Sequence, residues 1–161
     1  SDPVLYGRIR DLMISRRVIA RVGDLHGEHT LISLGQAARA LSVTMRTIYL
    51  SNVEQWFRYS PQFRRNLVQL PHDGRTVVLR TLARGDVPAP TEDRWHFSVQ
   101  TLDEFIARID NPVKRLRRVQ DLIPDMAHSV RPGVRGLSWL GQLPNPMPRP
   151  WAELPPLRST P

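Results

Sequence analysis

The sequence predicts a mainly α-helical protein with one small β-hairpin, followed by C-terminal helices and a proline-rich extended arm. Two observations carry this prediction: capping residues stand in front of several apolar runs, and a β-branched run follows a Pro-His-Asp-Gly turn. A hydrophobic content of 40% is sufficient for a modest core, and no apolar run is long enough for a membrane span. The absence of cysteine excludes disulfides and the usual zinc fingers. We therefore expect a cytoplasmic protein without a cofactor.

The N-terminal segment is predicted to begin with a helix. Asp2 stands before Pro3, which places a capping acid ahead of proline at the first helical position. Apolar residues recur near one face as far as Val22, and several arginines lie off that face. Beyond Ser15 the run RRVIARV fits a strand as well as a helix. We interpret this segment as scaffold first and as a phosphate contact second.

A short loop contains the densest group of metal-ligand residue types in the chain. Two histidines and two acids lie within six residues, a composition that can in principle hold a divalent ion. An irregular loop of this length cannot fix ligand geometry by itself, because nothing orients its side chains. We therefore predict no metal site at these residues: Asp24, His26, Glu28 and His29.

The stretch from Leu31 to Phe57 organises the predicted fold. Ser33 and Gln36 have the spacing of a capping box in front of an alanine-rich run. The segment Ser42-Val43-Thr44 interrupts that run, and Thr44 is a second good N-cap for a helix that begins at Met45. Two capped helices separated by three residues predict a helix-turn-helix, and an ordinary helical hairpin in a core is the alternative.

The run QAARALSVTMRTIY resembles the helix-turn-helix signature of many bacterial and phage regulators, including winged and MerR-like proteins. The resemblance covers about a sixth of the chain, and Ser42 stands where glycine is frequent in the family. It implies that the second helix enters the major groove of DNA with its first two turns against base edges. Residue by residue, the positions that would face the bases are Thr44, Met45, Arg46 and Tyr49.

A β-hairpin is predicted from Asn66 to Leu82, with its tip at His72–Arg75. The alternative is a helix over Thr76–Arg84, but three successive β-branched residues favour a strand. A hairpin after a helix-turn-helix is the wing of a winged helix, so residues 1–85 are predicted to form a winged helix-turn-helix DNA-binding domain. The predicted phosphate contacts are Arg39, Arg64, Arg65, Arg75 and Arg80.

The distribution of charge agrees with a DNA-binding N-terminal part. The chain has a formal net charge of +8, and 13 of its 23 basic residues but only 6 of its 15 acids lie in the first 85 residues. Lys114 is the only lysine, and guanidinium groups suit bidentate phosphate and guanine contacts. The codon bias of a GC-rich genome is an alternative explanation for the high ratio of arginine to lysine.

The C-terminal half is predicted to form a helical extension after a linker at residues 85–93. Within residues 94–128 we expect a short strand at RWHFSV and a helix from a capping box at Thr101 and Glu104 through Ile109. A further helix is expected at residues 112–123, with an apolar stripe available for a partner or a dimer contact.

Residues 129–161 are predicted to form the proline-rich extended arm. Eight of the fifteen prolines lie beyond Arg131, and alternating prolines between Pro144 and Pro150 favour polyproline-like backbone. Apolar residues such as Trp139 and Trp151 are anchors that a free linker does not need. We expect this arm to cross another surface, such as a second protomer.

The composite hypothesis is a sequence-specific protein that binds double-stranded DNA. We expect no enzymatic activity, because no glycine-rich phosphate loop, nucleophile elbow or strong metal motif is present. The function would be regulation of transcription, or of replication or partition of a mobile element, without membrane contact. The alternative is an interaction subunit of a larger nucleoprotein complex, in which the helix-turn-helix docks protein. Homodimers or larger assemblies would form through residues 112–123 and the C-terminal arm.

Overall fold

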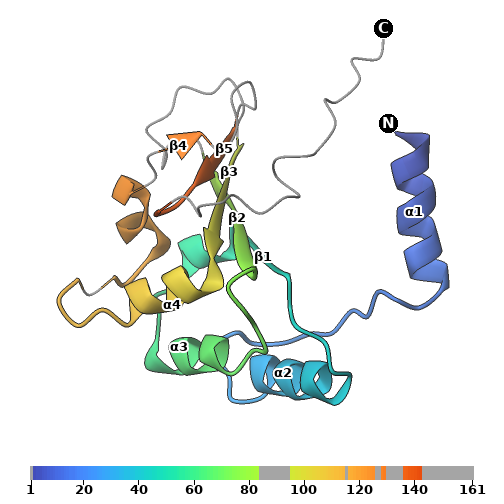
Figure 1. Ribbon diagram of the computed structural model, residues 1–161, viewed down its shortest axis with the longest axis horizontal. Coiled ribbons are helices and arrows are strands. Elements are labelled where there is room, and N and C mark those ends of the chain that lie inside the picture. The colour runs from blue at the N-terminus through green and yellow to red at the C-terminus, as the bar shows by residue number, and fades with distance from the viewer. Residues whose placement is uncertain (1, 84–94, 115, 126–127, 130–135, 143–161) are drawn as a thin grey trace, which may run out of the picture.

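A five-stranded mixed β-sheet forms the centre of the fold, and helices pack on one of its faces (Figure 1). The structure is a computed structural model that describes residues 2–83, 95–114, 116–125, 128–129 and 136–142. The helices are α1 (Pro3–Ile14), α2 (Thr30–Ala40), α3 (Pro61–Val68) and α4 (Leu102–Ile109). The strands are β1 (Thr47–Ser51), β2 (Val77–Ala83), β3 (Trp95–Thr101), β4 (His128–Ser129) and β5 (Leu137–Trp139).

The strand order is β1-β2-β3-β5-β4, so β1 and β4 are the edges. β1 and β2 run parallel and are joined through α3, as in a βαβ unit. β3 is antiparallel to β2 and parallel to β5. The protein is therefore an α/β domain with a central sheet. The prediction of a mainly α-helical winged helix-turn-helix is wrong.

The segment predicted as the second, DNA-reading helix is strand β1. Its sequence, TIYLS, is rich in β-branched and aromatic residues, and it pairs with β2 over residues 47–51. Long-range backbone bonds hold the strand and the turn before it: the Met45 amide donates to Pro71 O (2.9 Å), and the Val77 amide donates to Arg46 O (3.0 Å). Pairing with a distant strand thus outweighs the local capping signal at Thr44.

The predicted hairpin is half correct. Val77–Ala83 is a strand, as three successive β-branched residues indicated, but the preceding segment is helix α3 and no wing forms. Ser60 caps α3 by accepting the Phe63 amide (3.1 Å), and Pro61 occupies the first turn.

Several local predictions are confirmed. Asp2 caps α1 by accepting the Val4 and Leu5 amides, and Thr101 caps α4 by accepting the Glu104 amide. The strand predicted at RWHFSV is β3. The helix predicted at residues 112–123 is wrong, because the described part of this segment has bends and the short 3-10 helices Val119–Asp121 and Ile123–Asp125. The predicted linker and the Pro144–Pro150 segment lie outside the described residues.

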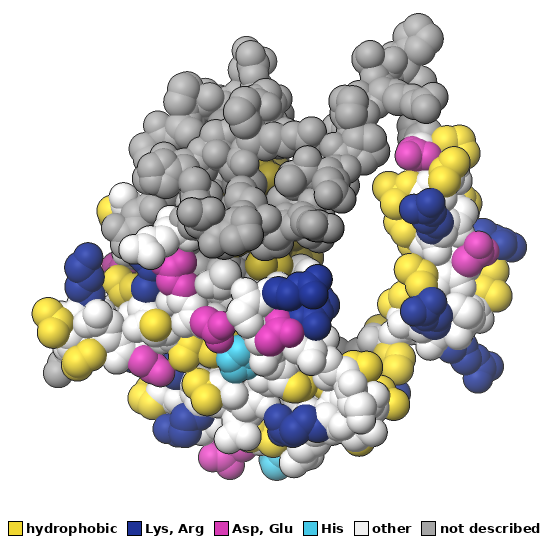
Figure 2. Space-filling view, in the orientation of Figure 1, with side chains coloured by type: hydrophobic (Ala, Val, Ile, Leu, Met, Phe, Trp, Pro, Cys, Tyr) yellow, Lys and Arg dark blue, Asp and Glu magenta, His cyan; other side chains and the backbone are white. Residues whose placement is uncertain are grey.

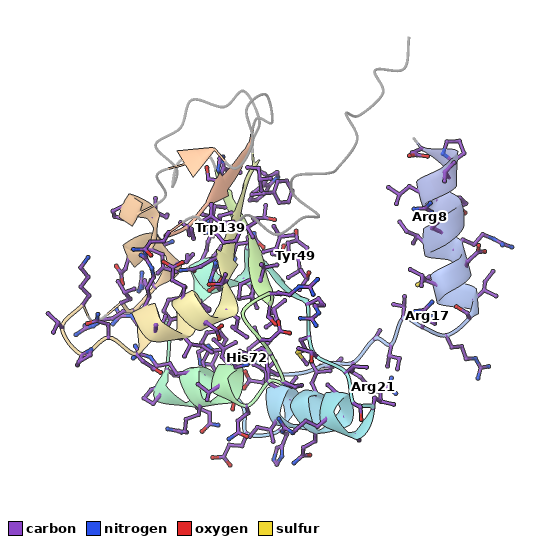
Figure 3. All side chains as sticks on the ribbon, in the orientation of Figure 1. Arg8, Arg17, Arg21, Tyr49, His72 and Trp139 are labelled. Atoms are coloured by element: carbon purple, nitrogen blue, oxygen red, sulfur yellow. The ribbon has the colours of Figure 1, made fainter. Side chains whose placement is uncertain are left out.

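The two faces of the sheet differ in what covers them. Val78 and Leu82 belong to the larger core cluster, together with side chains from the helices such as Phe63 and Phe105. The alternate residues, beginning with Val77, point to the opposite face, where the buried cluster is smaller and centres on Trp139. Figure 3 labels Trp139 on the strand next to β3.

Helix α1 stands apart from the rest of the described chain (Figures 1 and 2). It has no buried residue, although apolar side chains such as Leu5, Ile9 and Met13 are more than half exposed. The extended residues that follow it are also exposed: Ile19 is 71% and Val22 is 106% exposed. We call residues 2–22 the N-terminal arm.

A buried ion pair joins two strands to the loop after β1. Arg80 on β2 is 0% exposed, and its Nε donates to Glu54 Oε2 at 2.6 Å. The Tyr59 hydroxyl donates to the other carboxylate oxygen at 2.8 Å, and Arg80 Nη1 donates to Gln100 Oε1 at 3.3 Å. The Arg80 guanidinium also lies 4.3 Å above the centre of the Phe105 ring. Burial raises the pKa of Tyr59 well above its ordinary value, and the Glu54 carboxylate adds to that shift.

Residues of β3 continue this polar layer. Alternation places His96, Ser98 and Gln100 on one face, with Ser98 paired directly opposite Arg80. Buried atoms of these residues have no protein partner: His96 Nδ1, Ser98 Oγ, Gln100 Nε2 and Arg80 Nη2. His96 Nε2 lies 2.8 Å from Ser138 Oγ, and burial lowers the pKa of His96 below its ordinary value. The interior therefore holds polar groups that need exact placement of their neighbours.

Removing one partner of the buried pair should be strongly destabilising. We expect Arg80→Met and Glu54→Gln each to lower the free energy of unfolding by about 3–5 kcal/mol, because each leaves a buried polar group without its partner. The double variant should cost clearly less than the sum of the single variants, as measured by urea unfolding. Strictly additive costs would contradict a direct interaction between the two side chains.

The buried His96 should make stability depend on pH in the acidic range. Its pKa in the folded state is lowered, so below about pH 6.5 the unfolded chain takes up a proton that the folded protein does not. The free energy of unfolding should therefore fall with decreasing pH, by up to about 1.4 kcal/mol per pH unit from this residue. His96→Gln should remove this part of the slope, whereas His29→Gln, at an exposed position, should leave it unchanged.

Candidate anion-binding groove

The residues predicted to read bases do not lie on a helix. Thr44 and Met45 lie in the turn before β1, and Tyr49 lies on β1 itself. Arg46 is held by Asp73, with its Nη1 2.6 Å from both carboxylate oxygens, and this bond lowers the pKa of Asp73. Base readout by these residues stays a prediction. The helix on which that prediction depended is strand β1 in the structure.

Tyr49 has a different environment from the one predicted. Its side chain is 56% exposed on the sheet face opposite the main core, and its hydroxyl lies 2.8 Å from Thr81 Oγ1. This hydrogen bond is the main cause of a lowered Tyr49 pKa, and the Ser51 hydroxyl contributes as well. Ser51 itself has a left-handed backbone with a φ of 51°, at the point where the register between β1 and β2 shifts.

The five predicted phosphate contacts fall into distinct environments. Arg80 is buried in the ion pair with Glu54, and Arg39 donates from Nη1 to Gln69 O. Both groups therefore have protein partners already. Arg75 is exposed in the turn before β2, and only Arg64 and Arg65 share a recessed surface.

The loop predicted to hold no metal has a structural role. The His26 ring packs against Phe57 and Phe63, and its Nδ1 lies 2.9 Å from Ser60 Oγ. Asn66 on α3 donates to the carbonyls of Leu25 and Gly27 at 3.0 and 2.8 Å. Among the residues that the structure describes, no three His, Asp or Glu side chains are grouped as metal ligands.

A pocket of about 360 Å³ lies between the start of α3, the end of α4 and the segment before η3 (Val119–Asp121). Its charged lining consists of three arginines and one carboxylate. This volume lies at the lower end of the range that is usual for small-molecule sites. The complete lining is Arg58, Tyr59, Arg64, Asp110, Asn111, Pro112 and Arg117.

Specific hydrogen bonds hold the walls of this pocket. The Tyr59 amide donates to Arg117 O at 2.8 Å, which ties the segment before α3 to the segment before η3. Arg64 Nη2 donates to Leu116 O at 3.1 Å across the same gap. The Asp121 carboxylate accepts the Arg117 amide at 2.6 Å. The arginines are therefore carried by backbone whose position is fixed.

The pocket has an excess of positive charge. Asp110 is its only lining carboxylate, and the Asp110 Oδ1 to Arg64 Nη1 distance of 3.9 Å is long for an ion pair. No described carboxylate lies within ion-pair distance of Arg58 or Arg117, and both side chains are exposed. Arg64 Nε is buried without a hydrogen-bond partner among protein atoms. This arrangement favours an anion with several acceptor oxygens.

Two further pockets adjoin the first one. One of about 410 Å³ shares Arg64 and Asp110 with it and adds Arg65, and one of about 250 Å³ shares Asn111 and adds Lys114. The third pocket also contains Arg108, which is paired with Glu104 at 3.0 Å. We call the three adjoining pockets the arginine groove. Its basic residues are Arg58, Arg64, Arg65, Arg108, Lys114 and Arg117.

The groove is suited to binding more than to proton transfer. Guanidinium groups stay protonated at any physiological pH, and they present paired donors that match carboxylate and phosphate oxygens. The Tyr59 hydroxyl in the first pocket is committed to Glu54, and its pKa is raised by burial. The groove can therefore bind an anion at a fixed position.

Sequence reasoning found only part of this groove. Arg64 and Arg65 were identified because they lie in the basic N-terminal half. Arg58 and Arg117 were missed as ligand contacts, since they are far apart in the sequence and only the Tyr59–Arg117 hydrogen bond brings them together. The basic run KRLRR at 114–118 is the signal in the sequence that points to this wall of the groove.

The fold and the groove define an α/β domain with one recessed basic surface among its described residues. Residues 1–141 match the family DUF7790, a domain of unknown function, and the chain belongs to this family. The match includes the N-terminal arm and β5, so both are parts of the family's domain. No curated protein matches the sequence. Within the described part of the chain, every helix is too short or too polar to cross a membrane.

Occupation of the groove by a polyanion should stabilise the protein. At a concentration one hundred times its Kd, tripolyphosphate should raise the free energy of unfolding by about 2.7 kcal/mol, measured against sodium chloride at equal ionic strength. Arg117→Ala should reduce this gain. Arg75→Ala removes the same charge from a residue outside the groove and should not reduce it. Equal losses in both variants would show general screening instead of a site.

Proposed function

We propose that this chain is a binding domain for phosphate-bearing polyanions, and that the sugar-phosphate backbone of a nucleic acid is its ligand. The arginine groove carries the proposal, because three arginines and only one carboxylate line its first pocket and further basic residues line the two adjoining pockets. Arginine is the side chain best suited to bidentate phosphate contact.

Two features favour a nucleic acid over a single phosphorylated metabolite. The groove extends over three adjoining pockets, so it offers contacts to several successive phosphates. The chain also carries a net charge of +8, which attracts a polyanion over a longer range than the groove alone. A free phosphorylated metabolite would occupy one pocket and is the alternative source of the same chemistry.

The proposal does not include base readout. The helix that would have entered the major groove is strand β1, and Arg46 is paired with Asp73. Phosphate contacts position a protein on a nucleic acid but carry no direct sequence information. Binding should therefore depend on salt and depend little on sequence.

Fluorescence anisotropy with single-stranded and duplex oligonucleotides tests this function. We expect log K to fall linearly with log salt, with little difference between unrelated sequences. Arg64→Ala or Arg117→Ala should each lower the magnitude of that slope by about 1, because each removes one phosphate contact. Arg75→Ala serves as the charge-matched control outside the groove.

The outcomes separate the possible ligands. A strong preference for one oligonucleotide sequence would overturn binding through the backbone alone. Binding of tripolyphosphate without binding of either oligonucleotide would assign the groove to a small phosphorylated molecule. Slopes that do not change in the Arg64 and Arg117 variants would place nucleic-acid binding elsewhere on the protein.

A further inference from the structure

We infer that the N-terminal arm docks on a second copy of this chain, where residues 16–22 pair with the edge of β1 and α1 covers the exposed Tyr49 and Phe97 side chains. This docking does not involve the arginine groove. The N-terminal arm is exposed, the edge of β1 can accept a further strand, and contacts at residues 23–30 hold the base of the arm in place.

The arm has the apolar composition of an element that packs in a core, but none of its described residues is buried. All of its large apolar side chains are exposed, and the extended residues Val18, Ile19 and Val22 are at least half exposed. None of the described hydrogen bonds from residues 18–22 reaches the body of the protein. Exposure on this scale in a soluble domain indicates an interaction surface. Because the family match begins at residue 1, the arm is a regular part of the domain.

The free edge of β1 is a suitable surface for the extended part of the arm. Among the residues that the structure describes, β1 pairs with β2 alone, so its other edge has no described strand partner for its backbone amides and carbonyls. The run RRVIARV is rich in β-branched residues and can add a strand at such an edge. Thr47 and Tyr49 are exposed along β1.

The sheet face beside this edge is suitable for α1. Tyr49 is 56% exposed and Phe97 is 42% exposed on the face opposite the main core. In the view of Figure 3, Tyr49 lies on the side of the sheet nearer to α1. Val99 and Trp139 on the same face are buried, so the surface available to α1 is the part around the exposed Tyr49 and Phe97 side chains.

The root of the arm is fixed in a direction that leads away from the body. The Asp24 amide donates to Thr30 Oγ1 at 2.9 Å, and the loop that follows is held by His26 and Asn66. A Cβ at Gly23 would lie 2.3 Å from the Thr30 methyl group, so the backbone at Gly23 passes close to the start of α2. The base of the arm is therefore held against α2 while residues 2–22 stay exposed, and exchange of arms between two copies satisfies both surfaces.

Engineered cysteines can test the exchange cleanly, because the chain has no cysteine of its own. One tagged copy carries Ile19→Cys on the arm, and a differently tagged copy carries Thr47→Cys on the edge of β1. After co-expression of the 161-residue chains, a short bismaleimide should link one copy of each kind. The control pair, Ile19→Cys with Val68→Cys on α3, should remain unlinked.

Sedimentation of the unmodified chain gives the second readout. We expect a dimer, and Ile19→Pro should convert it to a monomer because proline cannot donate the amide that strand pairing needs. Circular dichroism should show that the variant stays folded. A monomeric unmodified chain, or a chain with both cysteines that links only within itself, would overturn the inference. Absence of any link in the mixed pair would overturn it as well.

Discussion

The buried contact between Glu54 and Arg80 is the constraint on which the rest of the structure depends. Two opposite charges without solvent access are tolerated only when their hydrogen bonds are well placed. Meeting that condition requires β2, the loop after β1, and Tyr59 to lie in one arrangement. The neighbouring Gln100 and Phe105 add β3 and α4 to the same arrangement. One ion pair therefore specifies how four elements meet.

Tyr59 connects this buried ion pair to the protein surface. The hydroxyl of this residue is bonded to Glu54 in the interior, and its amide is bonded to Arg117 at the wall of the groove. A short path of hydrogen bonds thus connects the core to the basic surface. The guanidinium groups that would hold phosphate are positioned by an interior that cannot shift without breaking a charged contact. Such a support is what a preorganised binding site requires.

Some local features of the fold could be predicted from sequence, whereas the long-range pairings could not. The capping box predicted at Ser33 and Gln36 is wrong, because α2 begins at Thr30 with His29 as its N-cap. Asp2 and Thr101 cap helices through contacts within a few residues, so their spacing was sufficient. The segment at Thr47–Ser51 follows an equally good cap, but it pairs with β2, and no local pattern reports that pairing. The groove was predictable only in part for the same reason, since its walls meet through the bond between Tyr59 and Arg117.

The unpaired edge of β1 has a consequence for how this protein assembles. The strand edge and the arm proposed to pair with it belong to the same molecule, and in the structure of one molecule they are not paired. If two molecules exchange arms reciprocally, they form a closed dimer. If the arm of each molecule docks on the next molecule, the contacts repeat without closing and produce a filament. Concentration and the stiffness of residues 15–23 would then decide between a closed pair and a growing fibre.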